Sequence, residues 1–202
     1  MAHANYGRLL LATTNRGKAA ELRSLLSCVA AEILDLDEIR LKLDVEEDGT
    51  TYEENARKKA IQASEVSGLP SLGDDSGIEI AGLGWRPGLL SARFYDGPWP
   101  DRLKKLLDSL RTGNQDGRKA RFVCVMALAE SGGVVALGRG VMACKIAYQP
   151  AGDHGFGYDP VVVPEGYAIT LAQMPFELKN RISHRALAAR DLYSRIHGLA
   201  PD

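Results

Sequence analysis

A hairpin signal in the second half of the chain constrains the fold more than any other feature. The apolar runs Phe122–Leu128 and Val134–Leu137 are separated by Ser131-Gly132-Gly133, residues typical of a tight turn. Two strands joined by so short a turn pair antiparallel. The chain opens differently, because the apolar run Arg8–Ala12 leads through a polar loop into helical spacing from Ala19 to Leu26. A sheet that holds both units is mixed, which argues against a purely doubly wound parallel fold.

The remaining periodicity predicts an α/β chain. Thr51 and Glu54 fit a capping box, and Gly68 with Pro70 ends the helix that they open. We expect further strands at 33–36, 78–80, 141–147 and 161–163, and helices at 51–67, 101–110 and 183–196. Pro-Gly and Gly-Pro pairs between residues 85 and 99 predict a long loop with one short helical turn. We predict a single α/β domain over residues 1–202, divisible into two lobes, with no internal repeat or linker.

Composition excludes several classes of function. Apolar residues make up 45% and charged residues 25% of the 202 residues, as in an ordinary globular protein. The formal net charge of -1 gives no global case for a nucleic acid or an anionic membrane as partner. Three well-separated cysteines without a CxxC pair support neither a disulfide framework nor a zinc site. No membrane span or signal peptide is evident, so we expect a cytoplasmic protein.

The segment Gly73-Asp74-Asp75-Ser76-Gly77 places two carboxylates and a hydroxyl between two glycines. Paired acids on a tight, glycine-bounded corner are suited to holding a hard cation such as Mg²⁺ and activating a water. An ordinary surface turn is the alternative, because Gly, Asp and Ser are common turn formers. On extended backbone the two acids would diverge to opposite sides, and periodicity alone does not say which one faces a ligand.

Two basic segments are candidate phosphate ligands. Thr13, Thr14, Asn15, Arg16, Gly17 and Lys18 lie between the first strand and the first helix, where free N–H groups and the helix dipole favour an anion. The loop is not a Walker A motif, because it lacks the first glycine and the Ser or Thr after the lysine. Asn55 and Lys59 share one face of the second helix. The alternatives are a solvated loop for residues 13–18 and ordinary exposed polar side chains for Asn55 and Lys59.

Two later segments suit a flat ligand and an anion. Glycines flank Phe156 in Gly155-Phe156-Gly157-Tyr158-Asp159-Pro160, which leaves an aromatic face open for stacking. Lys179, Ser183, His184 and Arg185 gather at the start of the last helix, where Arg185 can form a bidentate pair with a phosphate. A core aromatic and a structural histidine are the alternatives.

Taken in order, these motifs resemble the inosine triphosphate pyrophosphatase family over almost the whole chain. The set also includes Pro87-Gly88, Ser91-Ala92-Arg93 and Ala120-Arg121-Phe122. The resemblance implies an elongated α/β fold, a mixed sheet with flanking helices and two lobes around a central cleft, and a homodimer. It implies Mg²⁺-dependent hydrolysis of ITP, dITP and XTP to a nucleoside monophosphate and pyrophosphate, which removes deaminated purines from nucleotide pools.

The resemblance also assigns roles to residues. Asp75 matches the general base and a metal ligand, and Glu46 matches a second metal carboxylate. Positions that match substrate-binding residues are Thr13, Thr14, Asn15, Arg16, Gly17, Lys18, Asn55, Lys59, Ser76, Phe156, Gly157, Tyr158, Asp159, Lys179, His184 and Arg185.

The chain departs from the family pattern at Met142-Ala143-Cys144-Lys145 and at Gln173. None of these positions touches the expected phosphate or metal residues, so the departures concern the local backbone more than the activity. Two other functions remain open at this point: a related pyrophosphatase acting on modified pyrimidine or methylated nucleotides, and a nucleotide-binding protein without catalysis.

Overall fold

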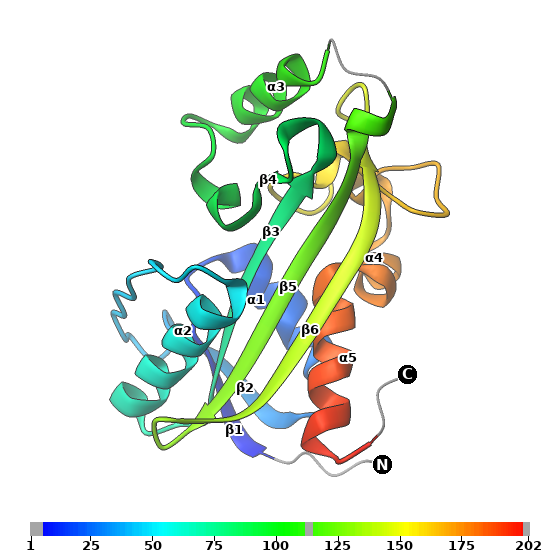
Figure 1. Ribbon diagram of the computed structural model, residues 1–202. Helices are drawn as coiled ribbons and strands as arrows, with labels where there is room; N and C mark the ends of the chain where they lie inside the picture. Colours follow the sequence, from blue (N-terminus) through cyan, green and yellow to red (C-terminus); the bar gives the residue numbers. More distant parts are fainter. Residues whose placement is uncertain (1–5, 112–114, 200–202) are drawn as a thin grey trace. The chain divides into compact units, whose positions relative to one another are not determined.

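The computed structural model describes residues 6–111 and 115–199, and its centre is a seven-stranded mixed sheet (Figure 1). The strand order is β2-β1-β3-β5-β6-β7, with β4 paired to β3. Strand β1 is parallel to both β2 and β3, whereas β4 is antiparallel to β3 and β7 is antiparallel to β6. The prediction of an α/β fold with a mixed sheet and flanking helices is therefore confirmed.

The strands are β1 (Tyr6–Leu11), β2 (Ala30–Asp35), β3 (Ser71–Ile80), β4 (Arg86–Pro87), β5 (Lys119–Glu130), β6 (Gly133–Ile146) and β7 (Val162–Pro164). The α-helices are α1 (Arg16–Leu25), α2 (Tyr52–Ser67), α3 (Trp99–Ser109), α4 (Phe176–Ile182) and α5 (His184–Ile196). Short 3₁₀ helices occupy Ala81–Leu83, Gly88–Arg93, Gln115–Arg118, Asp159–Val161 and Leu171–Gln173.

The chain divides into two compact units. The first unit contains the described residues of Met1–Asp75, Cys124–Gly140 and Arg185–Asp202, and the second contains those of Ser76–Val123 and Val141–His184. Strands β3, β5 and β6 contribute residues to both units. The prediction of one domain over 1–202 also covers residues outside the described ranges and stays a prediction.

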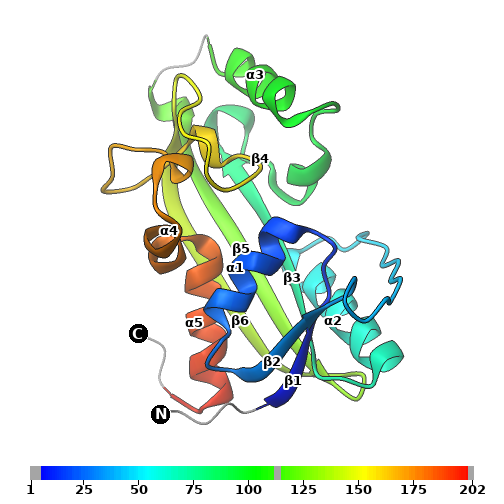
Figure 2. The same ribbon diagram turned by 180° about the vertical axis from the view of Figure 1, so that it is seen from behind.

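In the first unit, helices cover both faces of the sheet. Helices α1 and α5 pack on one face, where Leu22 and Leu192 meet Leu9 and Met126 (Figure 2). Helix α2 packs on the other face, where Ala56 and Ala60 meet alternate residues of β5. Because successive side chains of a strand point to opposite faces, the all-apolar run in β5 supplies both cores at once.

The predicted turn of the hairpin is confirmed. Ser131 and Gly132 join β5 to β6 with φ angles of 49° and 78°, both in the left-handed region that two-residue hairpin loops require. The prediction of two separate strands at 134–137 and 141–147 is wrong, because β6 runs unbroken through them. Gly138 does not end the strand. It admits the backbone of α5 instead, since a Cβ there would lie 2.3 Å from the Ala188 carbonyl oxygen.

Three further local predictions need correction. The expected corner at Gly73–Gly77 is extended backbone inside β3. Half of the predicted capping box is present: Thr51 accepts from the Glu54 N–H at 3.1 Å, but the Glu54 carboxylate reaches the Thr50 N–H. Helix α4 was not predicted, because its seven residues are too short to show a helical period.

All three cysteines are free thiols. Cys28 is exposed, whereas burial raises the pKa of both Cys124 and Cys144 to about 12. Across residues 6–111 and 115–199, no helix combines the length and the apolar character that crossing a membrane demands.

Candidate functional site

Strand β3 directs the two neighbouring acids in opposite directions. Asp74 and Asp75 lie on extended backbone and are 2% and 6% exposed. The Asp74 carboxylate meets α1 and α5, and the Asp75 carboxylate meets α2. A strand therefore gives two adjacent carboxylates separate surroundings, and those surroundings decide what each can do.

Asp74 is the centre of a buried ion network. Its Oδ2 lies 3.0 Å from Lys18 Nζ and 3.4 Å from Arg185 Nη2. Nη1 of Arg185 pairs in turn with Glu21 Oε2 at 2.5 Å. Burial alone would raise the pKa of Asp74, but Lys18 and Arg185 outweigh it and hold the pKa well below 3.8. Asp74 is thus a permanent anion that joins α1 and α5 to the sheet.

Asp75 has weaker partners on the opposite face. Asn55 Nδ2 donates a 3.0 Å hydrogen bond to Asp75 Oδ2, and Lys59 Nζ lies 3.6 Å from Oδ1. Burial raises the pKa of Asp75, and Lys59 and Asn55 only partly oppose the rise. A carboxylate whose charge is incompletely compensated is the kind that binds a cation or accepts a proton from water.

Lys59 connects Asp75 to a second acid. Its Nζ pairs with Glu47 Oε1 at 2.7 Å and donates to the Asp74 carbonyl at 2.9 Å. Burial lowers the pKa of Lys59, but Asp74, Asp75 and Glu47 outweigh burial and raise it. The ammonium group therefore occupies a position between the carboxylates of Glu47 and Asp75.

The structure distinguishes two acids that the sequence did not. Glu46, the predicted second metal ligand, is exposed, and it adds to the effect of Asp48 in raising the pKa of Lys58. Glu47 is the acid that shares Lys59 with Asp75. Adjacent glutamates in a segment without regular structure carry no periodicity, so nothing in the sequence separated them. The metal role of Glu46 stays a prediction.

The carboxylates of Asp75 and Glu47 together fit a divalent cation. Within the described residues no three His, Cys, Asp or Glu side chains form a cluster. Mg²⁺ is commonly held by one or two carboxylates, with waters and substrate phosphates completing its shell. Asp75 and Glu47 supply two carboxylates around one cation position, now taken by an ammonium group.

The predicted phosphate loop lies at the start of α1. Asn15 is its N-cap and accepts from the Lys18 N–H at 3.1 Å, and Thr13 Oγ1 accepts from the Asn15 N–H at 3.2 Å. Thr14, Asn15 and Arg16 are exposed, and no acid lies in the first helical turn. The helix end is open to an anion, and Lys18 extends from it to Asp74.

In the second unit, a short loop presents Phe156. Gly155 and Gly157 have φ angles of 74° and 64°, and the Phe156 N–H donates to Asp159 Oδ2 at 2.7 Å. Asp159 also pairs with Lys179, whose Nζ lies 4.9 Å from the Phe156 ring centroid. The loop therefore holds an aromatic ring beside a buried ion pair.

The other predicted residues of the second unit are placed as follows. Tyr158 is buried and its hydroxyl donates to the Ser91 carbonyl at 2.8 Å. The His184 ring, 4% exposed, stacks on Phe122 with centroids 4.3 Å apart and planes 8° apart. Ser76 is half-buried on β3. These contacts fix the orientation of the Tyr158 and His184 rings.

The structure brings the predicted residues together in two sets. In the first unit lie the loop at 13–18, Asn55, Lys59, Asp75 and Arg185, and in the second lie Ser76, the residues 156–159, Lys179 and His184. The sequence predicted that Lys18 and Arg185 serve one site with Asp75. The structure shows that both contact Asp74, one residue away.

Comparisons with known proteins identify the family. A model described as the Ham1 family matches residues 9–195. A dITP/XTP pyrophosphatase of Symbiobacterium thermophilum is 44% identical over 193 residues, 95% of this chain and 96% of that protein. One of Aquifex aeolicus is 42% identical over 197 residues, covering 92% and 94%. The structure of a HAM1 protein from Coxiella burnetii matches with a TM-score of 0.82 at 35% identity, covering 95% of this chain and 98% of that one. The chain belongs to the Ham1 family, in agreement with the resemblance seen in its motifs.

Proposed function

We propose that this chain hydrolyses the non-standard purine nucleoside triphosphates ITP, dITP and XTP to the nucleoside monophosphate and pyrophosphate. The observation that supports this most is the surroundings of Asp75, a buried carboxylate held by Asn55 and bordered by Lys59. Relatives that carry the name dITP/XTP pyrophosphatase match the chain over nearly its full length. The proposed role is the removal of deaminated purines from nucleotide pools.

In this proposal Asp75 orients the attacking water and accepts its proton. The hydrogen bond from Asn55 to Oδ2 fixes the carboxylate, so Oδ1 is the atom that takes the proton. Asp75 together with Glu46 or Glu47 would hold a divalent cation, which would supply charge neutralisation at the phosphate oxygens when bound. Lys18 and the N–H groups at the start of α1 hold the phosphate chain. No covalent intermediate is needed, because phosphoryl transfer depends on positioning and electrostatics.

The purine is selected by hydrogen-bond direction. Hypoxanthine and xanthine present an acceptor at C6, where adenine presents a donor. Lys179 and His184 are the proposed donors to O6, with the base stacked on Phe156 and Asp159 near the N1 edge. A site built to donate there leaves its donor unpaired against adenine, which can discriminate by about 10⁴–10⁵-fold.

Product analysis tests the reaction. With ITP and Mg²⁺, we expect IMP and pyrophosphate in equal amounts, separated by ion exchange and confirmed by phosphate release after added inorganic pyrophosphatase. Unchanged ITP would support a binding protein without catalysis, and turnover of modified pyrimidine or methylated nucleotides alone would support the related pyrophosphatase.

Single variants test the roles. Asp75→Asn should abolish turnover and leave nucleotide binding measurable, and retention of most activity would refute the role of Asp75. Glu46→Gln and Glu47→Gln form a matched pair: the variant that raises the Mg²⁺ concentration needed for half-maximal rate identifies the second metal ligand. An unchanged ITP:ATP ratio of kcat/KM in His184→Ala would remove His184 from base recognition.

The proposal also includes an oligomeric state and a cellular location. The family resemblance supports a homodimer in the cytoplasm. Light scattering after size exclusion measures the mass in solution, and a value near 21.9 kDa at micromolar concentration would contradict the dimer.

A further inference from the structure

A pocket in the second unit shares no residue with the candidate site. It has a volume of about 380 Å³ and lies between α3 and the segment that follows β6. Its lining includes the apolar side chains Pro100, Leu107 and Pro150. A volume of this size falls within the range of small-molecule sites.

One residue of the pocket lining is an uncompensated cation. Arg118 is only 6% exposed, and it forms no ion pair with any carboxylate in the described part of the chain. Its guanidinium donates to the carbonyls of Ala147 at 2.8 Å and Leu110 at 3.4 Å. Its Nε has no hydrogen-bond partner among residues 6–111 and 115–199. Carbonyl dipoles satisfy part of the group but supply no counter-charge, and buried charges are ordinarily paired.

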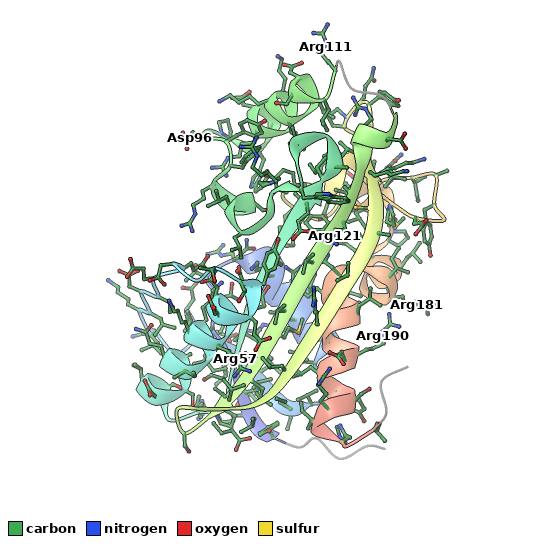
Figure 3. The ribbon with its side chains drawn as sticks, viewed as in Figure 1. Arg57, Asp96, Arg111, Arg121, Arg181 and Arg190 are labelled. Atoms are coloured by element: carbon green, nitrogen blue, oxygen red, sulfur yellow. The ribbon has the colours of Figure 1, made fainter. Side chains whose placement is uncertain are left out.

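The other charged residues of the lining leave the pocket positive. Lys104 and Asp108 pair with each other at 2.8 Å on successive turns of α3. Arg111 follows the helix and extends outward from it (Figure 3). The lining therefore contains three cationic side chains and one carboxylate, which favours an anionic ligand.

One wall offers a flat surface. Tyr148 is 66% exposed, and the Arg118 guanidinium lies 4.1 Å from the centroid of its ring. An arginine stacked on one side of a tyrosine fixes the ring and leaves the rest of it for a second planar group. An anion without a planar group would make no stacking contact with the Tyr148 ring.

We propose that this pocket is a second ligand site that binds a small anion carrying a planar ring, of the mononucleotide class. The phosphate lies near Arg118 and Lys104, and the ring packs on Tyr148 and the two prolines. The site is independent of the proposed hydrolysis, since none of its residues belongs to the catalytic or substrate-binding set.

Titration of the ¹⁵N-labelled protein with AMP, followed by NMR, tests the proposal. We expect saturable shifts of the Arg118 Nε–H and of the Lys104 and Tyr148 amides, separate from any shifts at the loop 13–18. Inorganic phosphate has only the anionic group and adenosine has only the planar ring, so each should bind more weakly than AMP. Absence of a saturable shift at the pocket up to about 10 mM AMP, well above millimolar dissociation constants, would overturn the proposal.

Exposed variants avoid the risk that an Arg118 variant fails to fold. Tyr148→Ala should weaken AMP binding about fivefold or more, the effect of losing one stacking partner. Lys104→Gln should weaken it roughly two- to fivefold, and Asp108→Asn should strengthen it by a similar factor. Lys105→Gln is the matched control, because Lys105 also lies on α3 but does not line the pocket. Equal effects of Lys104→Gln and Lys105→Gln would reduce the binding to general charge attraction and overturn the site.

Measurement of ITP turnover in the same variants separates the two proposals. All four variants should retain the rate of the parent protein. AMP binding without turnover would contradict the proposed function alone, and turnover without AMP binding would contradict this site alone.

Discussion

The neighbouring acids Asp74 and Asp75 should have opposite effects on stability when each is replaced by asparagine. Asp74→Asn leaves the guanidinium of Arg185 and the ammonium of Lys18 without their shared carboxylate, and Arg185 is only 2% exposed. Breaking a buried pair in this way costs about 3–5 kcal/mol. For a chain of this size that cost corresponds to a fall in Tm of roughly 6–20 °C.

Asp75→Asn should leave the free energy of unfolding unchanged or raise it. The raised pKa of Asp75 means that burial of its charge outweighs the attraction of Lys59 and the hydrogen bond from Asn55. Removing that charge therefore removes a net unfavourable term, while an asparagine oxygen can still accept from Asn55. This pattern fits a residue kept for function at the expense of stability.

The two acids also predict opposite pH dependences. The folded-state pKa of Asp74 is depressed, so the stabilisation that its charge gives the folded protein is complete above about pH 4. That stabilisation is lost as pH falls through the folded-state pKa. The folded-state pKa of Asp75 is raised, so its unfavourable contribution appears as pH rises from 3.8 through the folded value. The difference between Asp74→Asn and the parent should thus be largest at neutral pH and should shrink in acid.

Urea denaturation without divalent cations, at about pH 7 and about pH 2, measures both effects. Glu53→Gln is the control, because Glu53 forms an exposed pair with Arg57 on α2 and its loss should not change the midpoint detectably. The reasoning fails if Asp74→Asn unfolds at the same urea concentration as Glu53→Gln, or if Asp75→Asn is the more destabilised of the two acid variants.

Three more predictions concern binding, packing and reactivity. Phe156→Ala should raise the KM for ITP about 5- to 150-fold with a smaller change in kcat, since stacking contributes about 1–3 kcal/mol, and an unchanged KM in steady-state assays would argue against base stacking. Gly73→Ala should lower the free energy of unfolding by about 1–3 kcal/mol or more, because its Cβ would lie 2.4 Å from the Ala56 carbonyl oxygen, whereas Gly7→Ala meets no atom within 4 Å and should be tolerated. A thiol reagent should label one equivalent rapidly in the native protein, at Cys28, and three after unfolding, so fast labelling of more than one would contradict the burial of the other two thiols.

The sequence predicted the fold class because its strongest signals are local. The hairpin turn at Ser131 and Gly132 and the N-cap at Thr51 depend on a few adjacent residues. The strand break predicted between residues 137 and 141 was wrong, because the glycine at position 138 makes room for the backbone of α5 about 50 positions later, a contact that local sequence does not encode. The same limit hid the extended backbone at Gly73–Gly77.

The candidate site was predictable as a set of residues but not as a set of contacts. Extended backbone implied that the two acids diverge, yet the partners of each acid come from helices far along the chain. The sequence therefore could not assign Lys18 and Arg185 to Asp74, nor separate Glu47 from Glu46. Those assignments depend on tertiary packing.

The missing side chain at Gly138 sets how deeply α5 settles on the sheet. With only hydrogen at that position, the Ala188 carbonyl and the Leu192 backbone come to rest directly against β6. Arg185 lies one turn earlier on the same helix, so its guanidinium reaches Asp74 only at this depth. A methyl group added at Gly138 would displace α5 from β6 and move Arg185 away from Asp74, so this position on β6 controls a buried ion network whose charges it does not contact.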